Sequence, residues 1–234
     1  LTQAHSVLAL GLDLVFSAWR PVLSPEAVPN LVDEQGAFLD QHTLWARAAE
    51  IPPTELRAGF DTQVECFAAL AGRLPDHLDC HHFVHLSPPF FQAYADLAAH
   101  LALPLRVPFP LETEFEQALS TLPFLEGFPR DRVQGMIVTD SALVQARHLV
   151  HPDRFVGTFF GSETLTLDYL LSLLDALPSG TTELMCHPGY VDEDLASSSY
   201  RAEREIELAL LTHPTVRQRL DDMGIELTTF GTLR

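Results

Sequence analysis

Short apolar runs alternate with longer amphipathic segments along this chain of 234 residues. The run at 77–80 is typical, because it lies between a segment with helical apolar spacing at 54–70 and a second helix that Pro88 is placed to begin. Strands that alternate with helices indicate a mainly parallel sheet or barrel, in which each helix returns the chain to the start of the next strand. We therefore predict an α/β fold, and the length suits a single domain over residues 1–234.

Apolar spacing and the residues that start or stop helices predict the individual elements. Helices are expected at 54–70, 87–101, 141–148, 164–177, 199–211 and 214–224, with a weaker helical pattern at 115–125. Strands are expected at 8–16, 77–80, 103–107, 135–139, 155–160, 182–186 and 225–230, and a long loop at 19–40. Gly72 and Gly224 each follow the last apolar residue of a predicted helix, which is where glycine ends helices.

Charge and composition exclude several classes of partner. The net charge of −18 argues against nucleic acid and anionic membranes, because both bind basic surfaces. No apolar run is long enough to predict a membrane-spanning helix. The three cysteines are scattered and odd in number, which does not suggest a disulfide framework. We therefore expect a reducing, cytoplasmic setting.

The stretch 77–85 is the richest in groups that bind metals or move protons, with four histidines, one aspartate and one cysteine. Side chains alternate along a strand, so His77, Asp79 and His81 should share one face, and a helical turn would place His85 on the same side. Neutral imidazoles with a neighbouring carboxylate suit a divalent ion. Structural histidines that only bond to loops are the alternative, but such a cluster favours a functional site.

Other candidates stand outside this stretch. His187 ends a predicted strand before a proline-glycine turn and would suit a general acid, although it could also simply cap the strand. Asp13 is a carboxylate in an apolar run, which is costly unless it is paired or bound to a cation. Arg106 lies on a predicted strand and would bind a substrate carboxylate or pair with a buried acid. Cys80 and Cys186 are interpreted as small buried strand residues, with zinc ligation by Cys80 as the minority alternative.

Five sequence segments resemble those of the YdjC-like carbohydrate deacetylases. The stretch 77–85 resembles the family's His-Leu-Asp-Ser-His-His-His-Val-His, and 183–190 is close to the family's C-terminal motif. Residues 11–14, followed by the Arg-Pro at 20–21, resemble its Gly-Leu-His-Leu and Arg-Pro segment. Segments at 31–36 and 199–205 also match, so the resemblance covers nearly the whole chain.

This resemblance implies a distorted (β/α) TIM-like barrel, often dimeric, that removes an acetyl group from N-acetylated sugars. It also implies a divalent metal, most often Mg²⁺, with Zn²⁺ as the other candidate. His81 corresponds to a metal ligand of the family, and His187 corresponds to an active-site histidine. Asp13 stands where the family has a histidine ligand, and a carboxylate can also bind a hard cation.

Three departures from the family pattern define the rest of the prediction. Asp13 and Phe83 replace family histidines, and the family's opening strand with its Asp-Asp pair is absent from this chain. In the family, that pair supplies a metal ligand and the base. We therefore assign Asp79 as the base in this chain. We also expect a barrel that is incomplete at its N-terminus, with the chain either truncated or closing without that strand. His85 and Arg106 are assigned to substrate binding.

Two alternatives remain to the deacetylase. The first is a degenerate or truncated family member that binds a carbohydrate or a partner without catalysis. The second is another metallohydrolase, such as one acting on phosphoesters, which the scarcity of arginine near the motifs disfavours.

Overall fold

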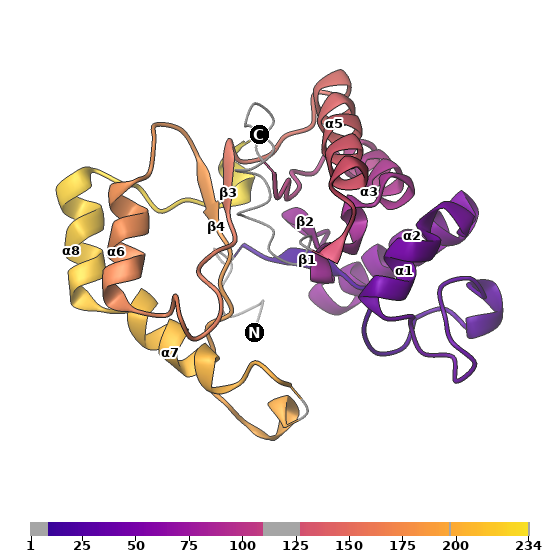
Figure 1. The fold of residues 1–234 in the computed structure, drawn as a ribbon, viewed down its shortest axis with the longest axis horizontal. Coiled ribbons are helices and arrows are strands. Elements are labelled where there is room, and N and C mark those ends of the chain that lie inside the picture. Colours follow the sequence, from indigo (N-terminus) through magenta and orange to yellow (C-terminus); the bar gives the residue numbers. More distant parts are fainter. Residues whose placement is uncertain (1–8, 110–126, 197, 234) are drawn as a thin grey trace. The chain divides into compact units, whose positions relative to one another are not determined.

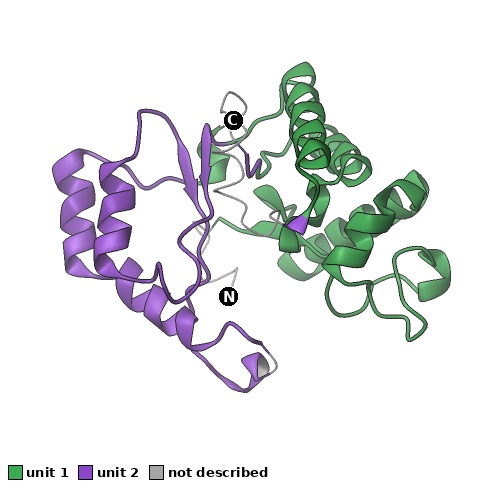
Figure 2. Ribbon diagram, in the orientation of Figure 1, with its two compact units in different colours: residues 1–106, 128–151, 229–234 green, residues 107–127, 152–228 purple. Residues whose placement is uncertain are grey.

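The computed structural model describes residues 9–109, 127–196 and 198–233. The chain divides into two compact units (Figures 1 and 2). Unit 1 contains residues 1–106, 128–151 and 229–234, and unit 2 contains residues 107–127 and 152–228. No helix in the described part of the chain is both long enough and apolar enough to cross a bilayer. The prediction of one domain over 1–234 stays a prediction.

Unit 1 is built on two short parallel strands, β1 (Gly11–Leu14) and β2 (His77–Cys80). Leu105 adds a parallel bridge to Leu78, where a longer strand over 103–107 was expected. Leu14, Leu78 and Cys80 are buried, because alternate side chains of the pair turn toward the core. The opposite face is left to polar side chains.

The described part of unit 1 has four α-helices beside these strands (Figure 1): α1 (Gln41–Arg47), α2 (Pro53–Ala71), α3 (Pro88–Leu101) and α5 (Arg130–Ala146). α2 and α3 confirm the predicted helices. Gly72 ends α2 with φ +72°, and its N–H donates to the Ala68 carbonyl at 2.9 Å. Ser87 is the N-cap residue of α3, but its hydroxyl donates to the Val84 carbonyl instead of capping the helix.

Short 3-10 helices complete unit 1. They span Pro25–Ala27, Ala48–Glu50, His81–Leu86 and Phe230–Leu233. The first two lie before and after α1, and the third connects β2 to α3. The fourth lies where the chain returns to unit 1 after unit 2.

An aromatic cluster forms the centre of unit 1. Phe16 is fully buried and meets Phe60 edge to face at 4.8 Å and Phe90 at 5.5 Å, measured between ring centroids. Gly59 on α2 makes this possible, since a Cβ there would lie 2.7 Å from the Phe16 ring. Buried aromatic rings of this size are the main apolar contribution to a small core. The cluster anchors the segment that leaves β1.

Unit 2 pairs β3 (Arg154–Val156) with β4 (Thr182–Leu184) in parallel and adds α6 (Leu167–Asp175), α7 (Ala202–Leu211) and α8 (Pro214–Met223). A 3-10 helix spans Glu193–Leu195. Figure 1 shows α6 beside α8, and these two helices are in contact. Buried residues of these two helices and of the segment before α6 form one core cluster: Phe159, Leu165, Leu170, Leu174, Val216 and Leu220. Gly224 ends α8 with φ +65°, as predicted.

The α/β class is confirmed. Among the described residues, the named strands form two parallel pairs and no closed barrel, which agrees with a distorted or incomplete barrel. Three local predictions were wrong: residues 135–139 lie within α5, residues 225–230 form no strand, and α7 starts at Ala202 and not near 199. The helical pattern predicted at 115–125 falls outside the described residues.

Candidate active site

Parallel pairing of β1 with β2 brings the candidate acids together. Asp13 and Asp79 are direct partners in the register, as are Gly11 and His77, so all four positions face the same side of the pair. The His77 ring lies over Gly11, where a Cβ would come within 2.2 Å of its Nε2 atom. Glycine at position 11 therefore allows a histidine on this face, next to the two acids.

Asp13 and His81 form the exposed centre of this group. The Asp13 Oδ2 atom lies 3.2 Å from His81 Nδ1, and the two side chains are 49% and 30% exposed. His81 is the first residue after β2, so the strand end presents its ring beside a carboxylate from the neighbouring strand. The proximity of these two predicted ligands agrees with a shared role, and both side chains remain partly exposed to solvent.

A strained turn fixes the chain just after His81. His82 and Phe83 both have left-handed backbones, with φ of +54° and +51°. Each such residue with a Cβ costs about 1–2 kcal/mol. Gln41 compensates by donating its side-chain amide to the His82 carbonyl, and Ser17 Oγ lies 3.0 Å from His82 Nδ1. Strain held by surrounding contacts is common where geometry serves function.

Asp79 and Arg106 form an ion pair, and both side chains are only 15% exposed. The Asp79 carboxylate also accepts the Cys80 backbone N–H at 2.6 Å. Pairing with a buried acid was one of the two roles open to Arg106. The assignments of Arg106 to substrate binding and of Asp79 to the base stay predictions, but the ion pair stabilises the charged carboxylate and so weakens it as a base.

His85 lies in the core of unit 1. Its side chain is 0% exposed, and both ring nitrogens lack a hydrogen-bond partner. The ring contacts Tyr94 with centroids 4.8 Å apart. Burial, helped by the Arg106 guanidinium, lowers the pKa of His85 to about 3, so the ring is neutral. This placement gives no support to the predicted contact with substrate.

His187 belongs to unit 2 and follows β4. Its ring meets Phe160 and Tyr200 edge to face, at centroid distances of 5.4 and 5.6 Å. The fully buried Glu207 of α7 accepts both the His187 backbone N–H and the Tyr200 hydroxyl. Burial and the bond to Glu207 raise the pKa of the Tyr200 phenol. A network of this kind sets the position of His187 and keeps Glu207 satisfied.

Sequence reasoning missed Glu207 as part of this network. The segment 199–205 was recognised as a family match and contains Tyr200, but it ends two residues before Glu207. A glutamate between two apolar residues, Ile206 and Leu208, would have been the signal, since such an acid needs partners when it is buried.

Asp13 and His81 are the residues that could hold a metal ion. No group of three or more histidine, cysteine or acidic side chains suited to a metal occurs within residues 9–109, 127–196 and 198–233. Mg²⁺ retains several waters and needs only one or two carboxylates, whereas zinc sites take three or four protein ligands. Burial raises the pKa of the Cys80 thiol, which disfavours a thiolate ligand. One carboxylate and one imidazole are too few ligands for a zinc site, and an ion that keeps several waters is the kind that this pair could hold.

Comparison with known proteins identifies the family. A family model described as YdjC-like protein matches residues 1–222. The chain belongs to the YdjC-like family. This confirms the resemblance inferred from the five sequence segments.

Curated relatives of this YdjC-like chain carry related names. It is 33% identical over 234 residues to a carbohydrate deacetylase from Geobacillus stearothermophilus, covering 98% of this chain and 78% of that protein. It is 29% identical over 235 residues to a chitooligosaccharide deacetylase from Yersinia enterocolitica, covering 99% of this chain and 80% of the relative.

A solved structure supports the fold. A crystal structure from Enterococcus faecalis V583, provisionally described as a cellobiose-phosphate cleavage protein, superposes with a TM-score of 0.79 and 27% identity. The match covers 99% of this chain and 80% of that chain. The two parallel strand pairs and their helices are therefore the arrangement of a known fold.

Proposed function

We propose that this YdjC-like chain is a metal-dependent deacetylase that hydrolyses the acetamide of N-acetylated sugars. The relatives named carbohydrate deacetylase and chitooligosaccharide deacetylase support the reaction class. The observation that carries the proposal is the solvent-accessible pair of Asp13 Oδ2 and His81 Nδ1, 3.2 Å apart, at the end of two parallel strands. Strand ends of this type are where α/β folds place their chemistry.

Asp13 and His81 would hold the ion in this proposal, with water filling its other positions. A bound divalent ion supplies a Lewis acid for the acetyl carbonyl and lowers the pKa of a bound water. Mg²⁺ is the ion we favour, because one carboxylate and several waters suit it.

Asp79 and His187 are assigned the two proton transfers. Asp79 takes a proton from the attacking water, whose oxygen forms a bond to the acetyl carbon. The C–N bond then breaks, acetate leaves, and His187 gives a proton to the departing amine. Support for Asp79 is its place beside Asp13 on the same strand face. Support for His187 is the family motif that contains it and the contacts that fix its ring.

The proposal is tested by acetate release from N,N′-diacetylchitobiose, measured with the purified chain before and after removal of divalent ions by a chelator. Release that stops on chelation and returns with Mg²⁺ is expected. His81→Ala should abolish the metal-dependent release, whereas His100→Ala, an exposed histidine in the last turn of α3, should leave it intact. Full activity of His81→Ala would refute the proposal.

A carbohydrate-binding protein without catalysis is the second candidate. It is favoured by one observation, that the described residues provide only a pair of metal-binding side chains here and no group of three. The Asp79–Arg106 ion pair points the same way, because it weakens the assigned base. Sugar binding without metal uptake and without acetate release would identify this candidate.

A further inference from the structure

Trp19 has a backbone that its residue type rarely adopts. Its φ is +61°, a left-handed conformation that suits glycine and is unusual for a bulky residue. The Phe38 N–H donates to the Trp19 carbonyl at 3.0 Å, which helps to hold this backbone in place. A large aromatic residue kept in a strained conformation indicates that its side chain serves a purpose there.

The Trp19 side chain is 71% exposed, although tryptophan is among the most apolar residues. Part of its surface stacks on His81, with ring centroids 5.5 Å apart and planes inclined by 27°. The remainder is open to solvent. The indole therefore borders the Asp13–His81 pair and offers an unoccupied apolar surface beside it.

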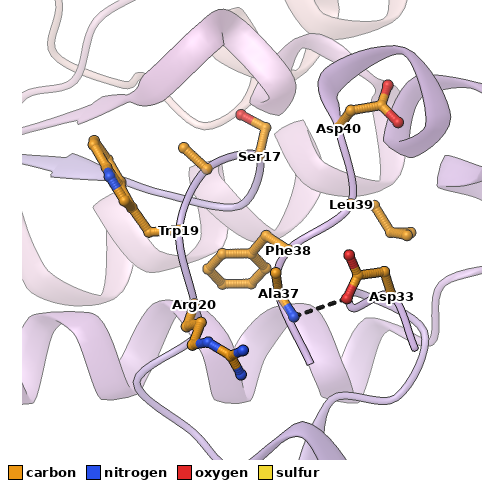
Figure 3. Close-up of a pocket in the computed structure, with 9 residues that line it drawn as sticks. Ser17, Trp19, Arg20, Asp33, Ala37, Phe38, Leu39 and Asp40 are labelled. Atoms are coloured by element: carbon orange, nitrogen blue, oxygen red, sulfur yellow. Dashed lines mark hydrogen bonds between the residues drawn. The ribbon is translucent and has the colours of Figure 1, made fainter. Parts of the chain in front are cut away.

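Trp19 also lines an open hollow of about 890 Å³ (Figure 3). Phe38 and Leu39 make part of its wall apolar. Ser17, Asp33 and Asp40 contribute side chains that carry oxygen atoms. A concave site of this volume with a few polar groups has the size and chemistry of a small-molecule site. Two lining residues connect the hollow to the Asp13–His81 pair. Trp19 stacks on His81, and Ser17 is hydrogen-bonded to the next residue, His82.

The acidic walls of the hollow are fixed in position. Asp33 accepts the backbone N–H groups of Gln35 and Ala37, both at 2.9 Å, and Figure 3 shows the second of these bonds. Asp40 accepts the Thr43 N–H at 3.0 Å as the N-cap of α1. Each carboxylate has lone pairs left to accept from a ligand hydroxyl. Arg20 also lines the hollow, so its wall offers hydroxyl groups both carboxylate acceptors and a guanidinium donor, which suits a polyhydroxylated ligand.

We propose that this hollow is a sugar subsite and that the indole of Trp19 stacks on a pyranose ring next to the N-acetylated residue undergoing hydrolysis. The subsite rests on the proposed function, because it defines which substrate reaches Asp13 and His81. A pyranose has an apolar C–H face that suits an aromatic ring and hydroxyl edges that suit Asp33 and Asp40. The chain should therefore prefer an oligosaccharide to a single N-acetylglucosamine.

Tryptophan fluorescence tests the subsite directly. The chain has two tryptophans, and Trp45 is only 2% exposed, so a neutral quencher such as acrylamide reports mainly on Trp19. We expect N,N′-diacetylchitobiose to protect Trp19 from quenching, and N-acetylglucosamine at equal concentration to protect it less. The same titration on Trp19→Phe should show no protection, because the remaining Trp45 is already buried.

Variant kinetics supply the second readout. Trp19→Ala should raise the KM for the disaccharide about tenfold, and by a larger factor than the KM for the monosaccharide, while Trp19→Phe, which keeps an aromatic surface, should have a disaccharide KM close to that of the parent. Leu70→Ala, at an 83% exposed position on α2, is the matched surface control. An unprotected Trp19 together with an unchanged disaccharide KM in Trp19→Ala would overturn the subsite.

Binding and catalysis can fail separately in this design. Protection of Trp19 without acetate release supports the subsite and counts against the hydrolytic function. Acetate release without protection supports the hydrolytic function and counts against the subsite.

Discussion

The guanidinium of Arg106 is paired with the carboxylate of Asp79, and neither side chain is more than 15% exposed. The two residues are 27 positions apart in the sequence. Each follows one partner of the parallel bridge between Leu78 and Leu105, and this bridge brings the two segments together. The pair keeps Asp79 charged next to Asp13 and fixes one side of the candidate active site. It also makes this site sensitive to the loss of a single positive charge.

Arg106→Ala should destabilise the fold and lower the activity that remains. Removing one partner of a largely buried ion pair leaves the other uncompensated, which typically costs about 3–5 kcal/mol, and the residual exposure here favours the lower end. The remaining activity should be lower than in the parent, because the carboxylate of Asp79 loses the partner that holds it beside Asp13. Urea unfolding and the rate of acetate release measure the two effects.

Asp79→Asn is the matched control for the ion pair. In the Asp79→Asn background, Arg106→Ala should cost much less than in the parent, since the charge that it would leave unpaired is gone. Equal costs in both backgrounds would show that Arg106 acts on stability through other contacts.

Position 13 should accept either of two ligand types. Asp13→Ala should weaken the binding of Mn²⁺, used as a substitute for Mg²⁺, by tenfold or more, since a carboxylate ligand is lost. Asp13→His restores the residue that the family carries here and should retain binding, because imidazole is also a good ligand. Titration calorimetry compares the variants. Identical affinities in all three proteins would place the ion elsewhere.

His85→Phe should retain deacetylation and reduce sensitivity to acid. His85 is buried with a pKa of about 3, whereas an unfolded histidine titrates near 6.5, so below pH 6.5 only the unfolded state takes up this proton. The stability contributed by the neutral ring is thus complete above pH 6.5 and is lost as the pH falls toward 3, by on the order of a few kcal/mol. Phenylalanine removes the titration.

Unfolding by urea between pH 7.5 and 4.5 measures this change. The variant should show a shallower loss of stability with acid than the parent. Part of the slope should remain, because burial also lowers the pKa of His77 to about 4. His100→Phe, at an exposed histidine, is the control and should keep the parental slope. Loss of acetate release in a stable His85→Phe protein would instead support the predicted substrate-binding role.

Trp19→Gly and Trp19→Ala should differ in stability although both lose the indole. Glycine adopts a φ of +61° without strain, whereas alanine keeps the strain of a residue with a Cβ. Trp19→Gly should therefore be the more stable of the two by up to about 1 kcal/mol, after the greater freedom of glycine in the unfolded chain is subtracted. Thermal unfolding of the two variants side by side checks the order, and a more stable Trp19→Ala would contradict it.

Local sequence patterns predicted several secondary-structure elements of unit 1. The strand at 77–80 and the helix beginning at Pro88 are confirmed, because apolar spacing and a proline at the first helical position are strong local signals. The buried Cys80 also agrees with the interpretation made from its position in a strand.

The mistaken strand at 135–139 has a physical reason. Ile137, Val138 and Thr139 are β-branched and favour strands locally, but the buried residues of α5 recur at helical spacing, at Val133 and Met136 and then Asp140 and Val144. The longer pattern prevailed over the local preference. The helical spacing was hard to recognise in the sequence because one of its four buried positions is Asp140, and an aspartate is not counted as a core residue.

Long-range relationships in the candidate site were not predictable from the sequence. The Asp13–His81 contact followed from a family resemblance, but the stacking of Trp19 on His81 and the bonds of Glu207 depend on the folded backbone. The left-handed turn at 82–83 also gave no clear signal, because a single histidine is only a weak mark of such turns and Phe83 is a residue type that rarely adopts them.

The most direct test of the central claim is the metal content of the purified chain, measured by elemental analysis together with acetate release from N,N′-diacetylchitobiose. The account predicts about one divalent ion per chain after equilibration with Mg²⁺, with release that depends on it and is lost in His81→Ala. A chain that takes up no ion and releases no acetate would contradict the account and would identify a YdjC-like fold without catalysis.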